Sequence, residues 1–216
     1  MTWVNGGLEI LNKGGVVMYI LLALSILALA IIVLKIFHFM RAQLRRLDFV
    51  EDVISHLAQG DVKEAQRLLG GHMNPVARVM EKTVEMAFEP GLSAKDRDAE
   101  IGRVGSGEVR RLESYLGSLE IIASLSPLLG LLGTVLGMIR AFVGLERAGA
   151  QVDPTILAGG IWEALLTTAF GLSIAIPALG AFYLFEGEVE RVRNAMKDVV
   201  VRINAALGSV RRIGGE

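Results

Sequence analysis

The sequence predicts an all-α integral membrane protein with three transmembrane helices and long cytoplasmic helical extensions. The first observation is composition: 52% of the 216 residues are hydrophobic, 21% are charged and the mean hydropathy is +0.50. The second is the arrangement of apolar residues in three long blocks, Val16–Leu34, Ile121–Ile139 and Pro154–Phe185, the third interrupted only by Glu163. About 20 apolar residues span a bilayer, so each block is long enough to cross.

Composition also argues against several other kinds of protein. The chain contains no cysteine, which excludes disulfides, thiolate metal sites and thiol catalysis. Its three histidines, His38, His56 and His72, lack the spacing of metal ligands, and the sequence has no phosphate-binding loop or hydrolytic triad. The net charge of −1 gives no sign of a nucleic-acid partner. We therefore expect neither an enzyme nor a bound cofactor, and we expect membrane lipid as the surroundings.

The first apolar block is expected to be an uncleaved anchor, because apolar residues continue after Ala28-Leu29-Ala30 and the basic residues follow the block. Residues 1–15 and 145–153 each contain a single Lys or Arg, whereas 38–118 contains 12 and 186–216 contains six. Lys and Arg gather in cytoplasmic loops. We expect the N-terminus and the short connection to lie outside, and the long loop and the C-terminal tail in the cytoplasm.

These observations divide the chain into exterior, membrane and cytoplasmic stretches that alternate along the sequence. They are a short exterior N-terminus (1–15), a first transmembrane helix (16–37), a cytoplasmic helical domain (38–120), a second transmembrane helix (121–144), a short exterior loop (145–153), a third transmembrane helix (154–185) and a cytoplasmic helical tail (186–216). Both exterior pieces are too small to form domains.

Local signals predict several helices inside the cytoplasmic domain. Apolar residues repeat at helical spacing over Leu44–Leu57, and Gly60 is expected to end that helix. Asp61 is the expected N-cap of a helix that ends at Leu69. A further helix is expected over Pro75–Phe88, because proline is favoured at the first helical position.

Ser93 with Asp96 marks another helix start, from which the helical pattern continues toward the second membrane segment. Four glycines weaken the prediction of an unbroken helix there: Gly102, Gly105, Gly107 and Gly117. In the tail, an apolar stripe predicts that the third membrane helix extends as an amphipathic helix. The stripe comprises Val189, Val192, Met196, Val199, Val200 and Ile203.

Small residues gather on one face of the second membrane segment. Ala123, Pro127, Gly130, Thr134, Gly137 and Ala141 recur at spacings of three and four, and on an ideal helix they fall within about 80° of arc. Small residues allow the close approach of another backbone or of a narrow file of water. Together with Gly133-x-x-x-Gly137, the pattern indicates either helix packing alone or packing combined with pore lining.

The third membrane segment adds polar groups. Gly160, Glu163, Thr167 and Gly171 share one face, whereas Thr168 lies about 140° from Glu163 and needs a different neighbour, for which the face of Thr134 is a candidate. A carboxylate in hydrocarbon is costly unless it is solvated, paired or protonated. Glu163 is therefore either a buried functional carboxylate or an interfacial residue on a protruding helix.

Two further features belong to these segments. The threonine hydroxyls can return a bond to their own helix or face water, so Thr134, Thr167 and Thr168 join Glu163 as candidate residues of an ion path. Lys35 and Arg140 border their segments, and we expect both to extend toward the interface as anchors.

Two long motifs resemble a known family. Ser126–Ile139, which reads SPLLGLLGTVLGMI, is similar to the second-helix signature of the MotA/TolQ/ExbB proton-channel family. Gly160–Leu165, Thr168–Leu172 and Ala175–Ala178 are similar to its third-helix signature. Together with the long cytoplasmic loop, the resemblance covers most of the chain.

The resemblance implies a homopentamer whose second and third helices surround a central pore. Two single-span subunits of the ExbD/TolR type would occupy the pore, each with an essential aspartate. The residues matching Thr134, Glu163 and Thr168 line the proton path or contact that aspartate in the family. The resemblance also implies that proton flow rotates the partner, which delivers work across the periplasm to a TonB-like or TolA-like protein.

The resemblance thus implies a subunit of an ExbB–ExbD type motor in the bacterial inner membrane, which uses the proton motive force to energise TonB-dependent outer-membrane transport. A TolQ-type subunit of the Tol–Pal envelope system is the near alternative, and a structural scaffold that conducts nothing is the alternative from another class. Flagellar stators of the MotA type are less similar to these motifs. A solute transporter would need substrate-binding polar groups on several helices, and this chain offers a single carboxylate. Whether Glu163 carries the proton or only shapes the field of the pore stays open.

Overall fold

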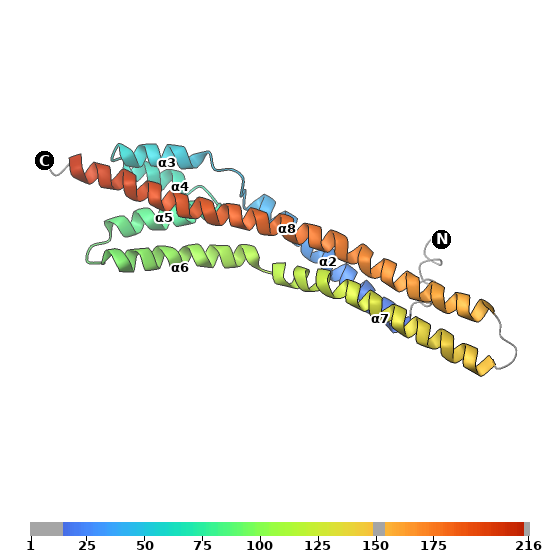
Figure 1. The fold of residues 1–216 in the computed structure, drawn as a ribbon. Coiled ribbons are helices and arrows are strands. Elements are labelled where there is room, and N and C mark those ends of the chain that lie inside the picture. Colours follow the sequence, from blue (N-terminus) through green and yellow to red (C-terminus); the bar gives the residue numbers. More distant parts are fainter. Residues whose placement is uncertain (1–14, 149–153, 214–216) are drawn as a thin grey trace. The chain divides into compact units, whose positions relative to one another are not determined.

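The structure, a computed structural model, describes residues 15–148 and 154–213, and it is helical throughout these ranges apart from short connections (Figure 1). The helices are α2 (Gly15–Arg41), α3 (Phe49–Ala58), α4 (Val62–Leu69), α5 (Pro75–Phe88), α6 (Ala94–Glu113), α7 (Leu116–Ala148) and α8 (Pro154–Ile213). No strand occurs in the described ranges. The all-α prediction is therefore confirmed for the described ranges. The expected exterior N-terminus (1–15) lies almost entirely outside the described residues.

Three helices are long and apolar enough to cross a membrane, as predicted: α2, α7 and α8. Helix α7 continues to Ala148, four residues beyond the expected end of the second segment, and α8 begins at the predicted Pro154. Large apolar side chains are exposed along all three, including Ile26, Leu128 and Ile176. Apolar surface of this extent is covered by lipid or by other chains.

The chain divides into two compact units. The described part of the first unit, the transmembrane unit, consists of residues 15–34, 115–148 and 154–184, and that of the second consists of residues 35–114 and 185–213. Helix α8 is continuous over 60 residues and contributes to both. The amphipathic extension predicted for the tail is confirmed as helix, because α8 continues to Ile213. Five residues of its apolar stripe, Val189, Val192, Met196, Val199 and Ile203, are buried in the second unit, and the sixth, Val200, is half-buried.

Side-chain caps set the helix starts of the second unit where the sequence predicts them. The Asp61 carboxylate accepts a hydrogen bond from the Glu64 amide at 3.2 Å, and the Ser93 hydroxyl accepts one from the Asp96 amide at 3.2 Å. Asn74 caps α5 by accepting from the Val76 amide at 2.9 Å. Each cap supplies an acceptor to an amide that has no partner inside the helix.

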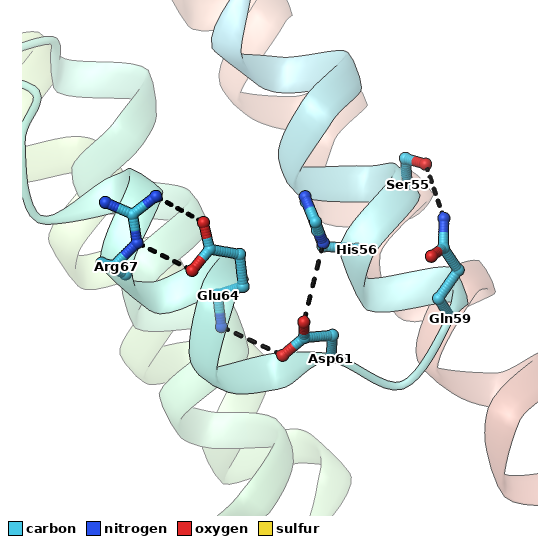
Figure 2. A network of polar contacts seen from close by, with 6 residues as sticks. All are labelled: Ser55, His56, Gln59, Asp61, Glu64 and Arg67. Carbon is cyan, nitrogen blue, oxygen red and sulfur yellow. Dashed lines mark hydrogen bonds and ion pairs between the residues drawn. The ribbon is translucent and has the colours of Figure 1, made fainter.

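The turn between α3 and α4 carries a small network of polar contacts, shown in Figure 2. His56 Nδ1 lies 3.8 Å from Asp61 Oδ2, and the Arg67 guanidinium pairs with the Glu64 carboxylate. The hydrogen bond from Arg67 holds the pKa of Glu64 below its ordinary value. The network joins the end of α3 to the first turns of α4 on the exposed side of the unit.

The predicted helix over Leu44–Leu57 begins too early. Helix α2 ends at Arg41, α3 begins at Phe49, and the intervening turn places Gln43 at a positive φ of 47°. The Asn74 side chain donates hydrogen bonds to the carbonyl oxygens of Gln43 and Arg46, at 2.9 and 3.2 Å, and so holds the turn. Leu44 is buried, so its place in the apolar repeat reflects burial and not a continuous helix.

A helix that runs unbroken from Ser93 into the second membrane segment is also not observed. Helix α6 ends at Glu113 and α7 begins at Leu116, with Tyr115 at a positive φ of 65°. Lys35 is fully buried, and its Nζ donates to the Leu112 carbonyl oxygen at 2.5 Å, which corrects its expected role as an interfacial anchor. A cation suits this position because the last carbonyls of a helix lack partners inside it.

Candidate functional site

Helices α7 and α8 pack against each other in opposite directions through their small residues (Figure 1). A Cβ added to Gly171 would lie 2.5 Å from the Ser126 carbonyl oxygen, and one added to Gly130 would lie 3.0 Å from that of Thr167. Gly137 opposes Ala164, and Gly160 opposes Ala141. These contacts bring the two backbones close together, with no room for a larger side chain between them.

The small-residue face predicted on the second segment is therefore largely the contact surface with α8. Ala123, Gly130, Gly137 and Ala141 are buried in the chain, and Gly133 packs against the Thr167 side chain. Pro127 and Thr134 are only half-buried. Packing within one chain accounts for most of this face, and the half-buried residues lie where another chain or water could reach them.

The three threonine hydroxyls all donate to backbone carbonyl oxygens. Thr134 Oγ1 donates to Leu131 at 2.6 Å, and Thr167 Oγ1 donates to Ala164 at 2.8 Å, so both bond within their own helices. Thr168 Oγ1 donates across the contact to the Gly130 carbonyl oxygen at 3.1 Å, and Thr167 Oγ1 also reaches that oxygen, at 3.4 Å. The separate neighbour expected for Thr168 is thus on the face of α7 that also carries Thr134.

Exposure separates the threonines. Thr167 is 1% exposed and fills the space in front of Gly133, whereas Thr134 and Thr168 are half-buried. A hydroxyl that donates to a carbonyl still keeps lone pairs that can accept a hydrogen bond. Thr134 and Thr168 can therefore accept from water or from another chain, while the position of Thr167 favours a packing role.

Glu163 has a partner that the interpretation of Arg140 as an interfacial anchor did not predict. Its carboxylate forms an ion pair with the guanidinium of Arg140 on α7, through Oε1 and Nη1. The Arg140 side chain is 52% exposed and the Glu163 side chain 20%. A Cβ added to Gly15, at the start of α2, would lie 3.1 Å from Arg140 Nη2. Arg140 is therefore the counter-charge of Glu163, a role that its expected function as an anchor does not include.

The sequence did contain a signal for this pair. When the small residues of the two segments are aligned in opposite directions, so that Ala141 faces Gly160 and Gly137 faces Ala164, Arg140 and Glu163 fall at neighbouring levels. Two helices joined by a short connection are expected to run in opposite directions, so this alignment is available from sequence.

The predicted site residues form two groups. One is the ion pair of Arg140 and Glu163, and the other is the set of three hydroxyls, of which those of Thr167 and Thr168 reach the Gly130 carbonyl and that of Thr134 bonds to Leu131. In the part of the chain that the structure describes, no hydrogen bond joins Glu163 to Thr134, Thr167 or Thr168. Thr167 lies four positions after Glu163 on α8, about 6 Å along the helix axis.

Three helices able to cross a membrane, two of them packed through glycines beside an ion pair, define a multi-pass helical membrane protein. A sequence model of the MotA/TolQ/ExbB proton channel family matches residues 72–198, more than half of the chain. The chain belongs to this family, as its two membrane motifs predicted.

Individual relatives agree with this assignment. The chain is 36% identical over 178 residues to "Putative biopolymer transport protein ExbB-like 1" of Synechocystis sp., which covers 79% of the chain and 66% of the relative. It is 29% identical over 185 residues to the "Putative biopolymer transport protein ExbB homolog" of Methanothermobacter thermautotrophicus, covering 85% of the chain and 64% of the relative. It is 45% identical over 75 residues to the "Tol-Pal system protein TolQ" of Haemophilus influenzae, covering 35% and 32%. The chain thus spans just under two thirds of the first two relatives.

The close contact of α7 and α8 gives a test by single glycine substitutions on α8. Gly171→Ala would place a methyl group against the Ser126 backbone, so we expect a loss of about 1–3 kcal/mol in the free energy of unfolding. Gly180→Ala is the matched control, because a Cβ there meets no atom within 4 Å and alanine is the better helix former. Thermal unfolding in detergent measures both, and equal midpoints for the two variants would contradict this packing.

Proposed function

We propose that this chain is a proton-channel subunit of an ExbB/TolQ-type motor in the bacterial inner membrane, driven by the proton motive force. The observation that carries the proposal is a carboxylate, Glu163, held with its own counter-charge between two helices able to cross the membrane, in a chain of a proton-channel family. Charged residues within membrane helices mark ion paths because burying them otherwise costs several kcal/mol.

The assembly that we propose is a homopentamer in which α7 and α8 of each copy surround a central pore. Two single-span subunits of the ExbD/TolR type would stand in that pore, each supplying an aspartate, with Thr134, Thr168 and Glu163 as the polar groups of the wall. The large exposed apolar side chains of α7 and α8, such as Leu128 and Ile176, support contacts with further chains. The buried residues Thr167, Gly133 and Gly171 would support the wall through packing.

The cellular role that we propose is to energise TonB-dependent outer-membrane transport, since the first two relatives above carry ExbB names. A TolQ-type role with a TolA-like protein is the second candidate, favoured by the TolQ relative from Haemophilus influenzae. Complementation of strains that lack one or the other system separates the two, because TonB coupling restores siderophore uptake and Tol–Pal coupling restores envelope integrity.

Measurements of proton flux test whether Glu163 and Thr168 belong to the proton path. In liposomes that contain this chain with its single-span partner, we expect Glu163→Ala and Thr168→Ala each to lower proton flux by about tenfold, a barrier increase of about 1.4 kcal/mol. Ser173→Ala is the matched control, because the exposed Ser173 hydroxyl donates to the Phe170 carbonyl oxygen in its own helix. Proton flux that stays at the wild-type level in both Glu163→Ala and Thr168→Ala would contradict the pore assignment and favour a structural scaffold that conducts nothing.

Native mass spectrometry in detergent tests the proposed oligomeric state. Five copies of 23.3 kDa give about 117 kDa for the ring without partners, and each bound single-span subunit adds its own mass. We expect the five-copy species, alone and with two partner chains. A stable dimer or hexamer of this chain would contradict the proposed pore.

The proposed topology places residues 1–15 and 145–153 in the periplasm and the segments 38–120 and 186–216 in the cytoplasm. Because the chain has no cysteine, a single cysteine introduced by substitution reports on which side of the membrane its position lies. A membrane-impermeant maleimide applied to intact spheroplasts is expected to label Gln151→Cys, and to label Lys95→Cys only after the membrane is opened. Labelling of Lys95→Cys in intact spheroplasts, with Gln151→Cys labelled only after the membrane is opened, would show the opposite orientation.

A further inference from the structure

We propose that Arg140 is a specificity-determining residue of the proton path, whose positive charge keeps metal cations such as Na⁺ away from Glu163 while protons pass. The inference rests on the proposed proton conduction and deepens it. It starts from the partner of the Glu163 side chain: within the described residues, the carboxylate pairs with a cation, Arg140, from the other helix of the same chain.

The exposures of the two side chains decide which charge an approaching ion meets. The Arg140 side chain is 52% exposed and the Glu163 side chain 20%, so the guanidinium is the more accessible of the two paired charges. The pair lies eight residues before the end of α7 and nine after the start of α8, about 12–14 Å along the helices from the short connection. An ion that enters from that side would meet a positive charge before it met the carboxylate.

The chemistry of the pair discriminates between ions. A lone carboxylate offers hard oxygen ligands that a metal cation prefers, and rings of carboxylates are what cation channels use. In the pair, one carboxylate oxygen accepts from Arg140 and the local net charge is zero. A metal cation would have to lose its water beside a fixed positive charge. A proton moves along hydrogen bonds and needs no such ligand cage, so the loss of hydration that hinders a metal cation here does not apply to it.

A purely structural role for the pair makes a different prediction. Arg140 also lies beside Gly15 at the start of α2, so the guanidinium contacts three helices of the transmembrane unit. If it acted only as a brace, its loss would lower thermal stability and leave the ion selectivity of assembled channels unchanged. Ion selectivity is therefore the readout that separates the two roles.

The test uses the full chain with its single-span partner in liposomes, with proton flux and Na⁺ influx followed by separate dyes. We expect Arg140→Gln to raise Na⁺ influx about tenfold over wild type, because it leaves the carboxylate uncovered and unpaired. The charge-preserving Arg140→Lys is expected to stay at the wild-type level. The double variant Arg140→Gln with Glu163→Gln is expected to return Na⁺ influx to that level, because it has no carboxylate left to bind the cation.

Each outcome decides the inference. Na⁺ influx through Arg140→Gln that equals wild type overturns it, and so does a leak in the double variant as large as that in Arg140→Gln. If native mass spectrometry shows that Arg140→Gln does not assemble, Arg140→Lys and the double variant carry the test, and a Na⁺ leak through either one overturns the inference. Wild-type channels that pass no protons would instead refute the proposed function, so the two failures are distinguishable.

Discussion

The close contact between α7 and α8 is the constraint on which the transmembrane unit depends. Lipid tails are as apolar as the helices, so helices associate in a membrane through packing and hydrogen bonds. Here Gly171 lies against the Ser126 backbone and Gly130 against Thr167 and Thr168. This approach sets the register of the two helices, and the register in turn places Arg140 beside Glu163.

The same contact explains how the polar groups are accommodated. An unsatisfied polar group in hydrocarbon costs several kcal/mol, and each group of the site has a partner. The carboxylate of Glu163 has a guanidinium, and the hydroxyls of Thr134, Thr167 and Thr168 have carbonyl oxygens. We infer that Glu163 in this chain is a fixed, paired charge in the wall of the path, which leaves the mobile carboxylate to a partner subunit.

The second unit is stabilised by interactions of another kind. Asp61, Asn74 and Ser93 cap the starts of α4, α5 and α6, and the apolar stripe of α8 is buried in the core of the unit. Buried Lys35 of α2 donates to the last turn of α6 at Leu112. Removing either member of a buried polar contact leaves the other without a partner, so such contacts help to specify where a helix ends.

The sequence by itself determined the three membrane helices, the caps at Asp61 and Ser93, and the small-residue face of α7, because hydropathy, capping and helical periodicity are local properties. It did not determine the break at Tyr115, the burial of Lys35 or the partner of Glu163. Those depend on which residues of distant segments meet, and one step in register would change the partner. Only the tertiary structure therefore decided that the carboxylate of the third membrane helix is paired with Arg140.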